Sequence, residues 1–146
     1  MLLMKFTALV TLAAVALTFV FSGKVGMMRR RYGVEAPAIT GHIEFEKANR
    51  IHYNTIEQLV LFIPLLWLGS SVIGDVPAAG LGVVWLVGRL IYASGYQRGA
   101  DKRGPGMIIT MLASFGLKFY PNLEKRVLIG LVTFQKFISK LFVGVT

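Results

Sequence analysis

Residues 45–57 read FEKANRIHYNTIE and lead directly into an uncharged apolar stretch that ends near Ile73. At 100° per residue, the polar members of this stretch fall within about 80° of arc on one helical face: Glu46, Arg50, Asn54 and Glu57. They stand at the mouth of a segment that is apolar enough to enter a bilayer. Ionisable residues inside a membrane are costly and are usually functional. This polar cluster therefore predicts a site that binds something polar within a bilayer.

The composition of the chain is that of a membrane protein. Apolar residues make up 55% of its 146 residues and charged residues 16%, whereas a soluble domain is nearer a quarter charged. Four apolar stretches stand out: Leu2–Phe21, Leu59–Ile73, Val76–Tyr92 and Met107–Phe119. A helix needs about 20 residues to cross a bilayer, and each stretch reaches that length once its polar ends are included. The sequence therefore predicts an all-α fold, an integral membrane bundle of four transmembrane helices.

We expect a single domain over residues 1–146, with spans at residues 3–30, 44–73, 77–99 and 104–120. The turn Gly74-Asp75-Val76-Pro77 is so short that the second and third helices should be antiparallel neighbours. Small residues of the third helix permit close helix contact: Ala79, Gly80, Gly82 and Gly88. Lysines break the apolar pattern of residues 122–145, which favours a further helix at the membrane interface over a fifth span.

Much of the net charge of +9 comes from basic residues at the ends of the predicted spans. Lys24 and Arg29–Arg31 lie at the end of the first span, and Arg98, Lys102 and Arg103 lie at the end of the third. By the positive-inside rule, this pattern places the 23–44 and 99–105 loops in the cytoplasm, and it argues against nucleic-acid binding. Residues 1–23 also have features of a signal peptide, but the arginines after them favour a retained first helix.

The polar cluster has a purely structural interpretation, an internal salt-bridge network in which Glu46 and Arg50 pair at i,i+4. Glu57, however, has no cation at i±3 or i±4, so its partner must come from another helix or from a ligand. A carboxylate accepts an ammonium group, and an arginine binds a carboxylate through two hydrogen bonds. The cluster therefore suits a zwitterionic, amino-acid-like ligand. Cysteine is absent, so any thiol chemistry must use a thiol that arrives with the ligand.

A second stripe follows one face of the third predicted helix: Trp85, Arg89, Tyr92 and Tyr96. Aromatic residues near a membrane surface can form only an interfacial belt, and Tyr96 fits that explanation. Arg89 interrupts an apolar run and needs an acidic neighbour, for which Glu57 or Glu46 is the candidate. An arginine of each cytoplasmic loop could also converge on a site and stabilise a thiolate there.

These groups resemble the family of membrane-associated proteins in eicosanoid and glutathione metabolism, which includes the microsomal glutathione transferases. The resemblance rests on Phe45-Glu46-x-x-x-Arg50-x-His52-x-Asn54-x-x-Glu57 and on Gly88-Arg89-x-x-Tyr92-x-x-Gly95-Tyr96. Span count, length and loop placement extend it over nearly the whole chain. It implies a homotrimer of four-helix subunits, with glutathione bound at each subunit interface near the cytoplasmic side.

The resemblance also implies roles for individual residues. Those that match glutathione ligands of the family are Arg30, Arg50, Asn54, Glu57, Tyr92 and Tyr96. Arg103 matches the arginine that holds the glutathione sulfur as a thiolate. Members similar to leukotriene C synthase carry a tyrosine where this chain has Gln58, so the subfamily and the electrophile stay open.

We therefore expect a membrane glutathione transferase that attacks lipophilic electrophiles reaching it from the membrane lipids. The same thiolate could also reduce lipid hydroperoxides. No metal is expected, because His52 has no second histidine nearby and should lie at a helix contact or the interface. Two alternatives stay open: a non-catalytic lipid-binding scaffold of the same family, and a small transporter that uses Glu57 and Arg89 as a relay. The membrane, bacterial or endoplasmic reticulum, is not distinguished.

Overall fold

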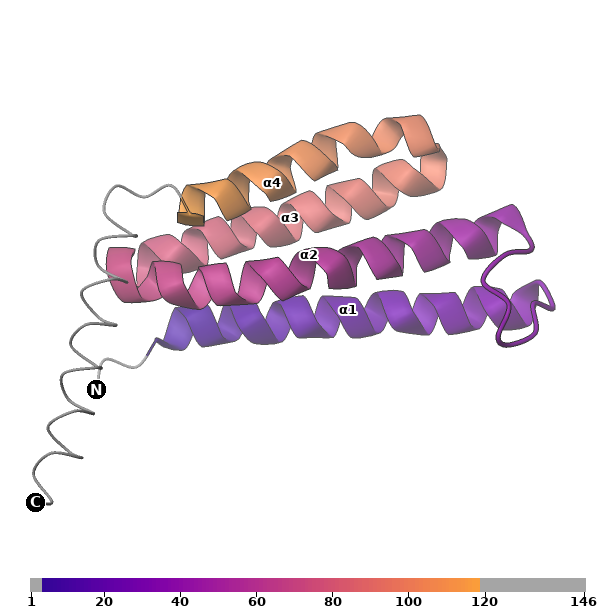
Figure 1. The fold of residues 1–146 in the computed structure, drawn as a ribbon, viewed down its shortest axis with the longest axis horizontal. Helices are drawn as coiled ribbons and strands as arrows, with labels where there is room; N and C mark the ends of the chain where they lie inside the picture. The colour runs from indigo at the N-terminus through magenta and orange to yellow at the C-terminus, as the bar shows by residue number, and fades with distance from the viewer. Residues whose placement is uncertain (1–3, 119–146) are drawn as a thin grey trace, which may run out of the picture.

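The computed structural model describes residues 4–118, and all the regular structure in that range is helical. The helices are α1 (Lys5–Arg31), α2 (Ile43–Ile73), α3 (Asp75–Arg98) and α4 (Gly104–Lys118), with a short 3₁₀ turn, η1 (Ala100–Arg103), before α4. Successive helices run in opposite directions, and α4 packs mainly against α3 (Figure 1). The α1–α2 loop and η1 lie at one end of the bundle, which we call the loop end, and the α2–α3 turn lies at the other (Figure 1).

The predicted all-α fold is confirmed over residues 4–118, which hold four α-helices. Each of α1, α2 and α3 is long and apolar enough to cross a membrane. The described part of α4 has 15 residues. It therefore rises about 22 Å, less than the roughly 30 Å of a bilayer core. The last residues of the span expected at 104–120 and the helix expected at 122–145 lie outside the described residues.

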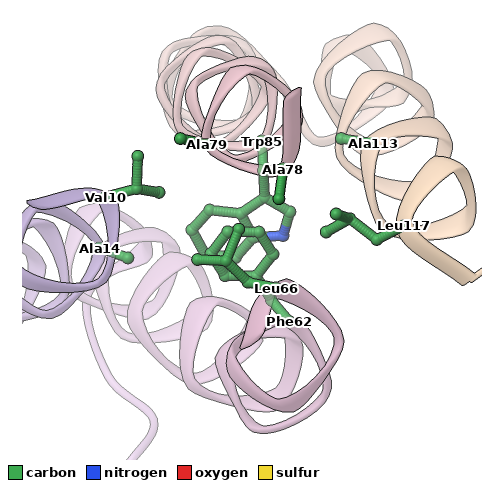
Figure 2. Packing of buried hydrophobic residues seen from close by; sticks show 9 residues of the cluster. All are labelled: Val10, Ala14, Phe62, Leu66, Ala78, Ala79, Trp85, Ala113 and Leu117. Atoms are coloured by element: carbon green, nitrogen blue, oxygen red, sulfur yellow. The ribbon is translucent and has the colours of Figure 1, made fainter. Parts of the chain in front are cut away.

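The hydrophobic core is centred on one aromatic pair between α2 and α3. Trp85 stacks on Phe62 with ring centroids 4.1 Å apart and planes 8° from parallel, and both side chains are fully buried. Apolar residues of α1 and α4 flank the pair on either side (Figure 2): Val10, Ala14, Ala113 and Leu117. The core thus joins all four helices through a contact between α2 and α3.

Glycines allow α3 and α4 to approach at backbone distance. A Cβ on Gly88 would lie 2.9 Å from the Thr110 backbone nitrogen, and one on Gly106 would lie 2.8 Å from the Gly88 carbonyl oxygen. A Cβ on Gly95 would collide with the Lys102 carbonyl group of η1. The prediction of close helix contact at Gly88 is confirmed, but Gly80 faces open space instead. Because these glycines lie towards the loop end, they hold η1 tightly against α3.

At the end of the bundle opposite the loop end, the carboxylate of Asp75 joins α3 to α1. It accepts hydrogen bonds from the backbone N–H groups of Phe6 (3.0 Å) and Thr7 (2.7 Å). These are among the first N–H groups of α1, which have no partner within their own helix. The buried Thr7 hydroxyl also donates to Ser70 Oγ at 2.9 Å, so the start of α1 is tied to α2 as well as α3.

At the loop end, Arg29 organises the α1–α2 connection. Its guanidinium donates to the carbonyl oxygens of Val34, Glu35 and Ala38 at 3.2, 3.1 and 2.9 Å. It also lies 4.7 Å from the centre of the Phe45 ring. Arg29 therefore does more than contribute to the positive charge at the loop end: it fixes the loop that leads into the polar cluster of α2.

Candidate functional site

The polar cluster lies in the half of α2 nearer the loop end and is split between the interior and the surface. Arg50 and Glu57 are exposed on the outer face of α2, while Asn54 between them is half-buried. Among residues 4–118, Arg50 donates no hydrogen bond and forms no ion pair, so its guanidinium is available to a ligand. A free guanidinium and an exposed carboxylate on one helix face can bind opposite charges of the same ligand.

Arg89 connects this cluster to α3, but not as the sequence predicted. Its Nη1 donates to Asn54 Oδ1 at 3.0 Å, and its Nη2 donates to Thr55 Oγ1 at 2.8 Å. Asn54 Nδ2 in turn donates to Glu57 Oε2 at 3.3 Å. The expected ion pair of Arg89 with Glu57 or Glu46 is therefore wrong: an asparagine amide stands between the guanidinium and the Glu57 carboxylate. The Arg89 guanidinium is buried and the Glu57 carboxylate is exposed, and among residues 4–118 Asn54 is the side chain that hydrogen-bonds to both.

The Glu46–Arg50 salt bridge of the purely structural interpretation is also absent from the described part of the chain. Glu46 instead accepts a hydrogen bond from the Gly41 N–H at 2.8 Å, just before α2 begins. The ion pair formed there joins Lys47 and Glu44 at 2.8 Å, and Lys47 also donates to the Gln97 carbonyl oxygen at 3.3 Å. The start of α2 is thereby tied to the end of α3. This leaves Arg50 free rather than consumed in an internal network.

The aromatic stripe of α3 leads from this network towards η1. Tyr92 is buried beneath the Arg89 guanidinium, which lies 4.3 Å from its ring centre. Tyr96 is half-buried, with its ring centre 5.7 Å from that of Tyr92. The Arg103 guanidinium lies 5.4 Å from the Tyr96 ring centre and is exposed. Arg103 is thus placed by η1 beside the residues that the sequence grouped as one stripe.

A pocket of about 560 Å³ opens beside this stripe at the loop end. Arg50 and Tyr96 both line it, although 46 positions separate them in sequence, and loop residue Ile39 forms part of its wall. Arg30 lies elsewhere in the chain: it is exposed and lines a separate hollow on α1 with Gly23, Gly26 and Met27. A single chain therefore gathers Arg50, Tyr96 and Arg103 but leaves Arg30 apart.

Sequence reasoning missed Thr55, whose buried hydroxyl accepts from Arg89 and donates to the Ile51 carbonyl oxygen at 2.7 Å. A helical projection places position 55 about 100° from Asn54, on the side of α2 that faces the core. This position was the one indication in the sequence that the Thr55 hydroxyl is buried, and it is a weak one. His52 is half-buried, and its Nδ1 has no partner among the described residues. It lies beside the Thr18 backbone of α1, which agrees with a helix contact.

Three membrane-length helices around an apolar core define the chain as a helical membrane protein. The chain belongs to the MAPEG family, whose family pattern it matches over residues 7–121. The resemblance drawn from the two motifs is thereby confirmed.

Relatives of the chain include proteins of bacterial and mammalian origin. An uncharacterized protein of Synechocystis sp. is 46% identical over 107 residues, which cover 73% of this chain and 78% of that protein. Microsomal glutathione S-transferase 2 of Homo sapiens is 35% identical over 105 residues, covering 66% of this chain and 71% of the relative. Leukotriene C4 synthase of Bos taurus is 40% identical over 96 residues, covering 66% of this chain but 64% of the relative.

Proposed function

We propose that the protein is a membrane-bound glutathione transferase that joins glutathione to lipophilic electrophiles. The observation that carries the proposal is the convergence of Arg50, Tyr96 and Arg103 at one end of a MAPEG-family bundle. The names of two relatives, microsomal glutathione S-transferase 2 and leukotriene C4 synthase, agree with this activity. The loop end would face the cytoplasm, where glutathione is available.

Glutathione carries two carboxylates, one ammonium group and one thiol. The free Arg50 guanidinium suits a carboxylate, and the outward Glu57 carboxylate suits the ammonium group. The half-buried Asn54 amide and the hydroxyls of Tyr92 and Tyr96 would hold the peptide between these charges. Arg30 of the partner subunit would complete the site in a homotrimer, because the Arg30 of the same chain lines a separate hollow.

Arg103 would act on the sulfur. A free thiol has a pKa of about 8.5, and a neighbouring guanidinium lowers the pKa of a thiol because it stabilises the thiolate. The thiolate then attacks the electrophilic carbon: a C–S bond forms, and the electron pair of the broken bond leaves with the departing group or ring oxygen, which takes up a proton. The electrophile would arrive from the lipid and glutathione from water, so the membrane surface is where both are present.

Rapid mixing of the purified protein with glutathione tests this proposal, because thiolate absorbance in the far ultraviolet reports the ionised sulfur. Wild-type protein should form thiolate near neutral pH, and Arg103→Ala should bind glutathione but form none. Glutathione binding by the wild type with no thiolate would favour the non-catalytic scaffold. The absence of any binding would refute both the enzyme and a glutathione-binding scaffold.

A further inference from the structure

Arg89 is a fully buried cation in the middle of α3, with 1% of its surface exposed. No carboxylate within residues 4–118 lies at ion-pair distance from it, and its Nε has no hydrogen-bond partner there. A buried charge without a counter-ion is strongly destabilising. Helix packing alone would be served better by an apolar side chain at this position. Its presence therefore calls for a role beyond holding α2 against α3.

The partners of Arg89 show what that role requires. A guanidinium has only donors, so the Asn54 amide must turn its oxygen towards Arg89. The Asn54 NH₂ group then points away, and it donates to Glu57 Oε2 at 3.3 Å. If the amide turned over, two N–H groups would face the guanidinium and the Nη1 donor would lose its acceptor. Arg89 thus sets the orientation of Asn54, and Asn54 sets the orientation of Glu57.

The orientation of Arg89 is itself fixed from two other sides. Thr55 Oγ1 accepts from Nη2 at 2.8 Å, and the Tyr92 ring lies beneath the guanidinium at 4.3 Å. Thr55 is fully buried and belongs to the same helix as Asn54 and Glu57. The chain of contacts therefore runs from the core to the surface, and it ends at the Glu57 carboxylate, of which only Oε2 is bonded within the described chain.

We propose that Arg89 is a positioning residue for the ligand site, which fixes the Glu57 carboxylate through the Asn54 amide so that the carboxylate meets the ammonium group of glutathione in one orientation. The inference rests on the proposed glutathione-binding function. Arg89 itself does not touch the ligand, because it is buried behind Asn54 and Tyr92.

A double-mutant cycle between Arg89 and Glu57 tests the proposal, with the Kd of glutathione measured by titration calorimetry on the purified full chain. Arg89→Gln and Glu57→Gln should each weaken binding about tenfold, the effect of one hydrogen bond to a charged group. The double variant should bind within about twofold of Glu57→Gln alone, because both changes remove the same interaction. Losses that multiply in the double variant, or a wild-type Kd in Arg89→Gln, would overturn the inference.

A milder variant covers the case in which Arg89→Gln does not fold. Thr55→Val removes one acceptor of Arg89, and it should weaken binding about threefold in wild type but not in the Glu57→Gln background. Thr18→Val is the control, since the Thr18 hydroxyl likewise bonds a carbonyl one turn back, at 2.9 Å, without touching Arg89. A Thr55→Val effect that equals the control, or that persists in Glu57→Gln, would contradict the inference. Wild-type protein that binds no glutathione would instead refute the proposed function and this inference with it.

Discussion

Replacement of Gly95 by alanine should impair catalysis without touching a residue that binds the ligand. Gly95 faces η1, where an added Cβ would lie 3.0 Å from the Lys102 carbonyl carbon and 3.5 Å from Arg103 Cα, with the Lys102 oxygen closer still. The atoms in the way belong to the backbone, so no side chain can turn aside to make room. The added methyl group must therefore push η1, and with it Arg103, away from α3.

The size of the displacement follows from these distances. Carbon atoms in contact are about 3.5–4.0 Å apart, so η1 must move by roughly 0.5–1 Å. A misplacement of about 1 Å at a reacting centre lowers a rate on the order of 100-fold. The Arg103 guanidinium would also leave the Tyr96 ring, from whose centre it now lies 5.4 Å away. We expect thiolate formation to fall by about one to two orders of magnitude. Overpacking should reduce the free energy of unfolding by about 1–3 kcal/mol.

The assay is thiolate formation and turnover of a soluble electrophile by Gly95→Ala, compared with Gly80→Ala. A Cβ on Gly80 meets no atom within 4 Å, and that residue lies on the exposed side of the same helix. Gly80→Ala should keep wild-type activity and gain about 0.5–1 kcal/mol of stability, because alanine favours the helix. If Gly95→Ala kept wild-type thiolate formation and turnover, the placement of Arg103 by η1 would be refuted.

Two further predictions concern the two ends of the bundle. Asp75→Ala should lower the free energy of unfolding by about 1–2 kcal/mol, because two N–H groups of α1 lose their acceptor. Thermal unfolding in detergent checks this, with the exposed Glu35→Gln as the control. Equal midpoint temperatures for Asp75→Ala and wild type would contradict a stabilising role of Asp75 at the start of α1. Arg29→Gln should make the α1–α2 loop more sensitive to protease, because three loop carbonyl oxygens lose their donor. The exposed Arg31→Gln should be cleaved at the wild-type rate, and the same rate in Arg29→Gln would show that the loop does not depend on Arg29.

The helices and the grouping of the candidate site residues on helix faces could be predicted because both depend on periodicity. Apolar stretches and basic flanks marked the helix ends, and i,i+4 spacing placed Arg50 and Asn54 on one face of α2. The stripe of Arg89, Tyr92 and Tyr96 was visible for the same reason. Helix patterns fix which residues share a face, and here those faces meet.

The pairing of side chains across helices could not be predicted, because it depends on how deeply each side chain is buried and on the rotamer that it adopts. Charge alone suggested that Arg89 would meet Glu57, yet the hydroxyl of Thr55 and the amide of Asn54 lie nearer to its guanidinium. Spacing likewise did not separate Gly80, which faces open space, from Gly88, which meets the backbone of α4. Both features depend on the crossing of two helices, which a periodic pattern does not specify.

The exposed half of the candidate site supports the homotrimer that we propose. Glu57 lies on the outer face of α2 beside Tyr53 and Val60, which are 49% and 66% exposed. A carboxylate on a face turned towards lipid is costly, so this face needs a polar cover. The exposed Arg30 of α1, which we propose as a further contact to the ligand, lies on a different surface of the chain. When two different surfaces of one chain complement each other, copies join head to tail and can close into a ring. The homotrimer that we propose would cover each Glu57 with a neighbouring subunit and its bound ligand, and it would bring the Arg30 of that subunit to the same site.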